Sequence, residues 1–292
     1  MAPKPTSLHN VDPDQKGATS PSINDTLFNR LYTRLARKTL ARLHKSDGLC
    51  TPISKRQIIK AGHRVCLREA ATMKYVAEST SIPVPKVHCS FVYKDRAFIL
   101  MERIRGETIP QAWAGLDEAA RQRVHSQLKA MIQELRALKP PPGTGVQNCV
   151  GGELFDSRIT RCPTFGPFKT VQDFHFWLRD ELTPAGAKHN IEEDEWRDIE
   201  KMVAMQDAAS WPPPVFTHGD LNPANILVRG GHVVGIIDWE FAGWYPHYWG
   251  YTSAWYGNIT RTDWQDALGQ FLEPFPAELE MERTRTRWWG EI

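Results

Sequence analysis

The chain has 292 residues, of which 24% are charged and 41% apolar, and its formal net charge is +2. These values are ordinary for a globular chain that is long enough to bury a substantial core. There is no basic block of the kind that marks nucleic-acid binding, and no apolar run approaches the roughly 18 residues of a transmembrane helix. We therefore expect neither a nucleic-acid partner nor a membrane partner.

The cysteines indicate a reducing compartment. They are odd in number, widely spaced and without a Cys-x-x-Cys pair: Cys50, Cys66, Cys89, Cys149 and Cys162. This pattern suits neither a disulfide framework nor a zinc site. The first residues, MAPKPTSLHN, also lack the apolar core of a secretory signal. Both features favour a cytoplasmic protein.

The first predicted elements are a tail and a helix. Residues 1–24 are rich in Pro, Ser, Asp and Lys, which is typical of a disordered tail. Asp25 is a suitable cap for a helix through Leu43, in which Leu27, Leu31 and Leu35 recur at helical spacing. The same segment carries a positive stripe of Arg30, Arg34, Arg37, Lys38 and Arg42. A solvated helix face explains this stripe better than a phosphate or membrane contact does.

A small β-rich lobe is predicted over residues 25–101. A short apolar strand at 57–60 is followed by a helix at 65–78. Two prolines, Pro83 and Pro85, favour extended chain and lead into strands at 86–91 and 97–101, which are joined by a turn at 94–96.

The remainder, residues 107–292, is predicted to be a larger and mainly helical lobe. Its helices are expected at 117–138, 171–182, 192–209, 264–271 and 278–289. The fold class that follows is α+β, with two lobes.

Residues 216–239, FTHGDLNPANILVRGGHVVGIIDW, hold the most informative pattern. A strand enters a polar loop that contains Asp220 and Asn225, and a hairpin with a Gly-Gly turn then delivers Asp238. Two carboxylates and one carboxamide thus meet at neighbouring strand ends. Phosphoryl transfer from a nucleotide uses these groups, because one Asp faces the acceptor hydroxyl while an Asn and a second Asp hold metal ions on the phosphates.

Two simpler explanations of this loop exist. His-Gly-Asp is by itself most often a turn, and His218 with Asp220 could form half of a metal site. Neither explanation predicts an Asn five residues after Asp220 or a second Asp eighteen residues after it, at the end of the next strand. The pattern therefore favours a kinase-like loop.

The loop resembles that of the aminoglycoside phosphotransferase and choline kinase group, the small-molecule branch of the protein-kinase-like fold. Gly219 before the catalytic Asp, and Asp238-Trp239-Glu240 in place of Asp-Phe-Gly, are similar to this branch. Segments 82–87, 101–106 and 237–246 are similar to a fungal subset of it. The resemblance covers roughly residues 50–290 and implies a two-lobed fold with ATP and Mg²⁺ at the cleft.

The resemblance also implies roles for the loop residues. Asp220 would orient, and help to deprotonate, the acceptor hydroxyl. Asn225 and Asp238 would hold Mg²⁺, which prefers hard oxygen ligands. His218 would brace the loop through backbone hydrogen bonds.

The nucleotide would be held from the small lobe. Lys60, at the end of an apolar strand, is the expected phosphate lysine, and Glu69 is its expected ion-pair partner. Lys60 could instead be an ordinary surface lysine, with Lys55 and Lys74 as competitors. Residues 102–106 would form a hinge behind the adenine, with the carbonyl of Glu102 and the amide of Ile104 as its ligands.

Two features depart from the family pattern. No Gly-x-Gly-x-x-Gly loop precedes Lys60, and Gly250 stands where many relatives carry Glu. The aromatic residues that follow Asp238, among them Trp239 and Trp244, could wall an acceptor pocket, although core packing explains them better. Glu240 could meet an amine of the acceptor.

The expected activity is phosphorylation of a hydroxyl on a small molecule, with an aminoglycoside- or choline-like acceptor. The first alternative is a pseudokinase or nucleotide-binding module with little turnover, which the missing glycine-rich loop favours. A Ser/Thr protein kinase is disfavoured, because Gly219 precedes the catalytic Asp and no Ala-Pro-Glu follows Asp238.

Overall fold

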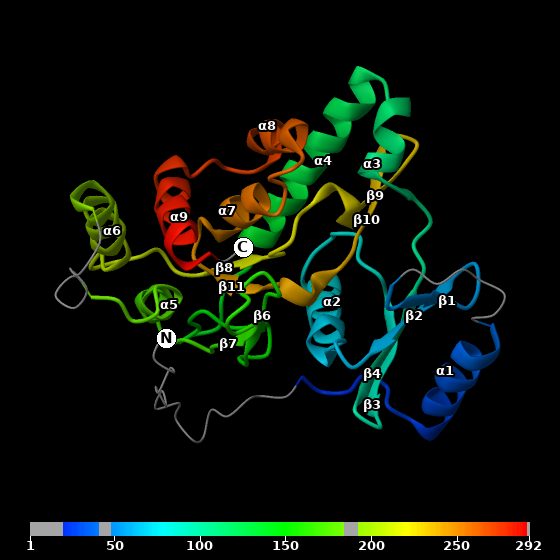
Figure 1. The fold of residues 1–292 in the computed structure, drawn as a ribbon. Coiled ribbons are helices and arrows are strands. Elements are labelled where there is room, and N and C mark those ends of the chain that lie inside the picture. The colour runs from blue at the N-terminus through cyan, green and yellow to red at the C-terminus, as the bar shows by residue number, and fades with distance from the viewer. Residues whose placement is uncertain (1–19, 41–47, 184–191, 291–292) are drawn as a thin grey trace.

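The small lobe is an antiparallel sheet between two helices (Figure 1). The computed structural model describes residues 20–40, 48–183 and 192–290. The sheet has the strand order β1-β2-β4-β3, and its elements are β1 (Cys50–Pro52), β2 (Gln57–Gly62), β3 (Val87–Tyr93) and β4 (Arg96–Glu102). The helices are α1 (Leu27–Leu40) and α2 (Leu67–Ser79).

The two faces of this sheet serve different purposes. Successive side chains of a strand point to opposite faces. Ile59 is therefore buried with Phe91 and Phe98 in a cluster that includes Ala36 of α1. Its neighbour Lys60 points the other way, towards Glu69 of α2. The lysine thus reaches the inner side of the lobe because it is one residue out of phase with the α1-facing core.

The predicted helix is present as α1, and it docks with its leucines facing outward. Leu27, Leu31 and Leu35 are 81%, 56% and 58% exposed, whereas Thr33 and Ala36 are buried. The rings of Phe91 and Phe98 stack 5.1 Å apart on the sheet face that packs with α1, so small residues make the closest approach. Leu43, the predicted end of the helix, lies outside the described residues.

Three arginines of the positive stripe contact rings of the sheet, which corrects the solvated-face interpretation for them, whereas Lys38 is exposed and Arg42 lies outside the described residues. The guanidinium groups of Arg34 and Arg30 lie 3.7 and 5.6 Å from the ring centres of Tyr93 and Phe91. That of Arg37 lies 5.8 Å from Phe98. Such cation–π contacts anchor the helix by its basic side.

The start of α1 also differs in detail from the prediction. The backbone N–H of Asn29 donates to the hydroxyl of Thr26 at 3.1 Å, so Thr26 serves as the cap that was expected at Asp25. Ile23 pairs with Ser90 through two backbone hydrogen bonds of 2.8 and 3.1 Å. The predicted tail, 1–24, therefore includes at least one residue that joins the lobe, and its residues 1–19 lie outside the described part.

The large lobe is mainly helical. Its helices are α3 (Ile109–Ala112), α4 (Glu118–Arg136), α5 (Val171–Leu178), α6 (Glu193–Gln206), α7 (Trp249–Tyr256), α8 (Thr262–Phe271) and α9 (Pro276–Trp289). Its strands are β5 (Glu107–Thr108), β6 (Leu154–Phe155), β7 (Thr164–Phe165), β8 (Val215–Thr217), β9 (Ile226–Arg229), β10 (His232–Ile236) and β11 (Gly243–Tyr245). The predicted two-lobed α+β fold is confirmed.

The strand pairing places the polar loop between two small sheets. The predicted hairpin is present as β9 and β10, and β5 adds to it as a third strand. The strand that precedes the loop, β8, pairs instead with β11. Helix α7 was missed because it is apolar on all sides and has no helical periodicity to detect.

A single apolar cluster connects the lobes. It includes Val76 and Ile99 from the small lobe and Phe216 and Trp239 from beside the polar loop. This shared core fixes the loop against α2. Among the described residues, no helix has the length and apolar character that crossing a membrane requires.

Candidate active site

Lys60 lies at the centre of a carboxylate cluster. Its Nζ is 2.9 Å from an Oε of Glu69 and 2.7 Å from an Oδ of Asp238, and 3.4 Å from Glu240. Asp238 is 178 residues away in the chain. The expected Lys60–Glu69 ion pair is present, and both side chains are buried. Lys60 is therefore not an ordinary surface lysine.

The cluster has more negative than positive charge. Burial alone would lower the pKa of Lys60, but attraction from Glu69, Asp238 and Glu240 outweighs it and raises this pKa above its usual value. Burial raises the pKa of Glu69 to about 7, against the opposing effect of the lysine. Oxygen atoms of the three carboxylates lie within 4.8 Å of one another.

Asp220 is held by side-chain amides. One of its carboxylate oxygens, Oδ2, accepts hydrogen bonds from Asn222 at 3.0 Å and from Asn225 at 2.9 Å. The same amide nitrogen of Asn225 also donates to the Asp220 carbonyl. Because Asn225 uses its nitrogen in this way, its amide oxygen is left for another partner. The two predicted loop residues thus form one rigid unit.

His218 links the loop to the strand before Asp238. Its Nδ1 accepts the backbone N–H of Asp220 at 3.2 Å. Its Nε2 therefore carries the hydrogen and donates to the carbonyl of Ile237 at 3.0 Å. Burial lowers the pKa of His218, which keeps the ring neutral in this tautomer. These are backbone contacts of the kind expected for a bracing residue.

The loop depends on two residues with positive φ. Gly219 has φ +82°, and a Cβ there would lie 2.4 Å from the carbonyl oxygen of Phe241. No larger residue fits, which is the physical reason for glycine before Asp220. Asp238 has φ +65°, a conformation that Asp and Asn tolerate better than most residues.

The predicted hinge leaves the small lobe at the end of β4. Glu102 is the last residue of that strand, and the chain reaches β5 at Glu107, which pairs with β9. The side chain of Ile104 packs over Gly235 of β10, where a Cβ would lie 2.7 Å from it. Glu102 and Ile104 thus lie where the two lobes join.

Trp239 and Trp244 are packed in the core, which agrees with the interpretation that the sequence favoured. They are 0% and 1% exposed. The ring of Trp239 packs at a tilt against His218, with ring centres 4.5 Å apart, and its indole N–H donates to the carbonyl of Ile236. Trp244 packs on Phe216. Both support the loop from behind, as the core-packing alternative predicts.

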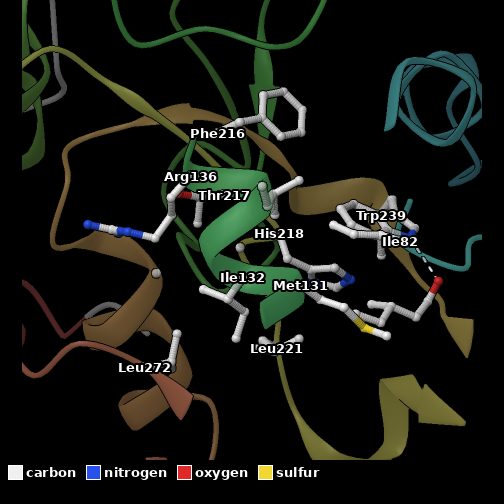
Figure 2. Close-up of a pocket in the computed structure, with 14 residues that line it drawn as sticks. Ile82, Met131, Ile132, Arg136, Phe216, Thr217, His218, Leu221, Trp239 and Leu272 are labelled. Atoms are coloured by element: carbon white, nitrogen blue, oxygen red, sulfur yellow. Dashed lines mark hydrogen bonds between the residues drawn. The ribbon is translucent and has the colours of Figure 1, made fainter. Parts of the chain in front are cut away.

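A small apolar cavity lies behind the loop (Figure 2). Its volume is about 40 Å³, and its lining includes Thr217, His218, Trp239 and Gly250. Gly250 approaches Thr217, where a Cβ would lie 3.3 Å from the threonine methyl group. Gly250 therefore borders empty space beneath the loop.

Glu240 is directed at the lysine. Its Oε2 lies 3.4 Å from Lys60 Nζ, on the same side as Asp238, and burial raises its pKa. That Glu240 also meets an amine of the acceptor stays a prediction. It belongs to the charged cluster around Lys60.

Sequence reasoning missed Arg158 and Asp156. Arg158 makes a two-pronged ion pair with Asp156, and it also donates to the carbonyl of Gly219 at 2.7 Å. Its nearest nitrogen is 3.9 Å from Asp220. Asp156 is 2% exposed and lies directly after β6. The only sequence signal was Asp-x-Arg in a segment that reads as loop.

Arg158 connects three segments behind the loop. Besides Gly219, it reaches the carbonyl of Ser253 in α7 at 3.3 Å and lies over the ring of Phe241. The loop that carries Asp220 is thus held by a residue that lies outside the β9–β10 hairpin. Only the tertiary fold brings this arginine to the site.

Comparison with solved structures shows the fold. The most similar include the apo form of a thermostable mutant of aminoglycoside phosphotransferase APH(4)-Ia, at 14% identity and TM-score 0.52, covering 84% of this chain and 85% of that one. A ternary complex of such a mutant with AMP-PNP and hygromycin B has 15% identity and TM-score 0.56, covering 84% and 82%. The gentamicin complex of APH(2'')-IIa has 15% identity and TM-score 0.53, covering 90% and 88%.

Comparison of the sequence alone gives a family. No curated protein matches the chain. The model of the phosphotransferase enzyme family matches residues 56–287, which is most of the chain. This range contains the charged cluster around Lys60 and the whole loop from His218 to Asp238. The chain therefore belongs to the phosphotransferase enzyme family and is a phosphotransferase.

Proposed function

We propose that the protein transfers the γ-phosphoryl group of ATP, with Mg²⁺, to a hydroxyl of a small molecule of the aminoglycoside- or choline-like class. The convergence of Lys60 with Glu69 and Asp238 supports this most, because a lysine so placed can bind nucleotide phosphates. Structures with this fold are described with AMP-PNP, hygromycin B or gentamicin. These ligands favour a nucleotide donor and a small acceptor.

The residues around Lys60 suit Mg²⁺. Three carboxylates surround one ammonium, so a bound cation would offset the excess negative charge of the cluster. The carboxylate oxygens are hard ligands of the kind that Mg²⁺ prefers. Asp238 and the amide oxygen of Asn225 are the ligands we assign. When bound, the metal would offset the negative charge on the phosphates. Glu240 would add a carboxylate on the same side.

The side chains of the protein would then position the reactants. Asp220 keeps Oδ2 engaged by the two Asn amides, which leaves Oδ1 to accept the hydrogen of the acceptor hydroxyl. As the new oxygen–phosphorus bond forms, the bond to ADP breaks and the hydroxyl proton passes to Asp220. The backbone of Glu102 and Ile104 would hold the adenine.

Arg158 would act as a positioning residue in this scheme. It holds the carbonyl of Gly219 and so fixes the peptide that precedes Asp220. A shift of about 1 Å in a reacting group can cost roughly a hundredfold in rate. We therefore assign to Arg158 part of the anchoring that Gly250 cannot supply.

A nucleotide-binding module with little turnover is the competing function. It is favoured by one observation, the lack of a Gly-x-Gly-x-x-Gly sequence before Lys60. Residues 41–47, which precede β1, lie outside the described part of the chain.

Calorimetry of ATP binding with and without Mg²⁺ tests the cleft. Asp238→Asn should abolish the Mg²⁺-dependent part of binding. Asp95→Asn is the matched control, since Asp95 also has positive φ, +57°, but is exposed at a turn. Failure of the unchanged protein to bind nucleotide would sink the proposal.

Transfer of label from [γ-³²P]ATP separates the two functions. The panel would contain aminoglycosides, choline, amino sugars and a general protein substrate. Label on a small molecule supports the proposal. Nucleotide binding without transfer to any of them would support the binding module, and label on protein alone would point to a protein kinase.

A further inference from the structure

Helix α1 presents an apolar face to solvent. Eight large apolar side chains are exposed in the described part of the chain, and five of them lie on this one helix: Leu27, Phe28, Leu31, Tyr32 and Leu35. Single exposed apolar residues need no explanation, but a contiguous group of this size marks a contact surface. The remaining three are scattered over other elements.

The leucines of the exposed face do not hold α1 in place, whereas Tyr32 at its edge donates its hydroxyl hydrogen to Oε1 of Gln57 at 2.8 Å. The helix is fixed by buried Thr33 and Ala36 and by the three arginines that lie over aromatic rings. Leu31 and Leu35 can therefore be exchanged without loss of the contacts that dock the helix. Their exposure leaves them free to bind something outside the lobe.

One edge of this face is strongly basic. A groove of about 740 Å³ runs between α1 and the β3–β4 turn, and its lining includes Leu31, Leu35 and five cationic residues: Arg34, Arg37, Lys38, Lys94 and Arg96. No carboxylate lines it. The whole chain has a net charge of only +2, so this concentration of cations is local.

We propose that α1 is a peripheral binding site for a membrane surface that carries anionic phospholipids. An amphipathic helix that lies in the interface places its Leu and Phe side chains at the acyl boundary and its cations among the headgroups. Leu27, Phe28, Leu31 and Leu35 would enter the bilayer, and Lys38, Lys94 and Arg96 would meet the lipid phosphates. This is contact with one leaflet, and it departs from the expectation that the protein has no membrane partner.

Other occupants of this face fit less well. Residues 1–19 contain only Met1, Leu8 and Val11 as large aliphatic side chains, too few to cover five exposed residues. A second copy would bring another set of cations to the same interface, with no carboxylate in the groove to pair them. The basic edge favours an anionic surface over either of these.

The site is compatible with an open cleft. Helix α1 packs on the sheet face that carries Ile59, Phe91 and Phe98, whereas Lys60 points to α2 on the other face. Figure 1 shows α1 and α2 on opposite sides of the sheet. Membrane contact through α1 therefore does not cover the side of the sheet on which the charged cluster around Lys60 lies.

Co-sedimentation of the full chain with large vesicles tests the proposal. The probes are vesicles of phosphatidylcholine alone and of phosphatidylcholine mixed with phosphatidylserine. We expect binding to the mixed vesicles that weakens with added salt, and little binding to phosphatidylcholine. Lys38→Glu/Lys94→Glu should weaken this binding by roughly thirtyfold or more, since each lysine near an anionic surface contributes about a fivefold change.

The apolar contribution is tested by Leu31→Ser/Leu35→Ser, which should lower vesicle binding at least about tenfold. Ile259→Ser is the matched control, because Ile259 is 60% exposed on another part of the molecule. Lys129→Glu is the control for charge, on the exposed face of α4. Both controls should bind as the unchanged protein does, and a melting temperature for every variant shows that it folds.

Four results would overturn the proposal. They are no binding to mixed vesicles, equal binding to both vesicle types, equal loss in the Ile259 or Lys129 control, and vesicle binding that survives Leu31→Ser/Leu35→Ser. Sedimentation equilibrium adds a separate check: a dimer that this double variant dissociates would assign the face to a second copy. Vesicle binding that appears only after residues 1–19 are deleted would assign it to that segment.

Discussion

The hairpin that leads to Asp238 and the helix α1 were both predicted from the sequence and are both present, but only in the hairpin did the pattern also indicate where the side chains point. In the loop, Asn225 directly precedes β9 and Asp238 follows shortly after β10, and the alternation of these strands leaves little choice of orientation. In α1, the leucine spacing correctly predicts a helix but does not tell which side is buried, and the leucines prove to be exposed. The difference shows that periodicity identifies the faces of an element, whereas the surface that the element packs against decides which face is buried.

The partner surface differs in the two regions. The loop packs against Trp239 and Phe216, which belong to the same stretch of sequence. Helix α1 packs against a sheet face already occupied by stacked Phe91 and Phe98, far along the chain. The planar guanidinium groups of arginines can lie over such rings, so the basic side of the helix docks on the sheet.

Asp220→Asn should have the largest effect on function. The amide oxygen can still accept from Asn222 and Asn225, so the loop is retained, but the group that accepts the hydroxyl proton is lost. The rate of phosphoryl transfer should fall about 10²- to 10⁴-fold. ADP binding, measured by calorimetry, should change little. Full turnover in this variant would mean that the sequence pattern misidentified the catalytic residue.

Gly219→Ala should unfold the loop and destabilise the protein. A Cβ would meet the Phe241 carbonyl at 2.4 Å, and φ +82° adds strain. We expect a loss of about 3 kcal/mol or more in the free energy of unfolding. Gly230→Ala is the control, since its φ is also positive, at +58°, but a Cβ there meets nothing within 4 Å. Equal losses in both variants would show that backbone strain alone, and not the close approach, constrains Gly219.

Arg158→Met tests whether a residue that the sequence did not reveal shares in the site. It leaves buried Asp156 without its partner and should cost about 3–5 kcal/mol of stability. Arg158→Lys keeps the charge but loses the forked contact, and should lower kcat about tenfold without changing KM for ATP. A rise in KM for ATP with unchanged kcat would place Arg158 in nucleotide binding instead of loop positioning.

The pH dependence of kcat/KM for ATP should reflect Glu69. Its pKa is raised to about 7, so it gains a proton as the pH falls from about 8 to about 6 and loses its attraction for Lys60. Activity should therefore fall on the acid side of about pH 7, by about tenfold per unit at the limit. Glu69→Gln should be less active at pH 8 but should lack this acid limb. An unchanged profile in that variant would exclude Glu69 as its source.

The smallest effect concerns the outward face of α1. Leu31→Ser/Leu35→Ser should change the free energy of unfolding by less than about 0.5 kcal/mol, because these side chains are exposed. Ala36→Leu should cost about 1–3 kcal/mol, because Ala36 is buried against the sheet. If the leucine pair proved the more costly change in thermal unfolding, the helix would be docked by the opposite face.

The sequence by itself determined the elements and the chemistry of the loop. The spacing of Asp220, Asn225 and Asp238 identifies a phosphotransferase loop because these residues are local to one hairpin. The strand that ends at Lys60 and the helix that carries Glu69 are also visible as patterns. Roles of individual residues in catalysis and nucleotide binding remain predictions that the experiments above test.

Only the tertiary structure decided how distant surfaces meet. It brought Asp156 and Arg158 behind Gly219, buried Trp239 and Trp244, turned Glu240 to Lys60 and exposed the leucines of α1. Each of these outcomes depends on a partner far away in the chain, and a pattern of spacing carries no information about such a partner. That information lies in how the segments pack against one another, which depends on their shape and volume.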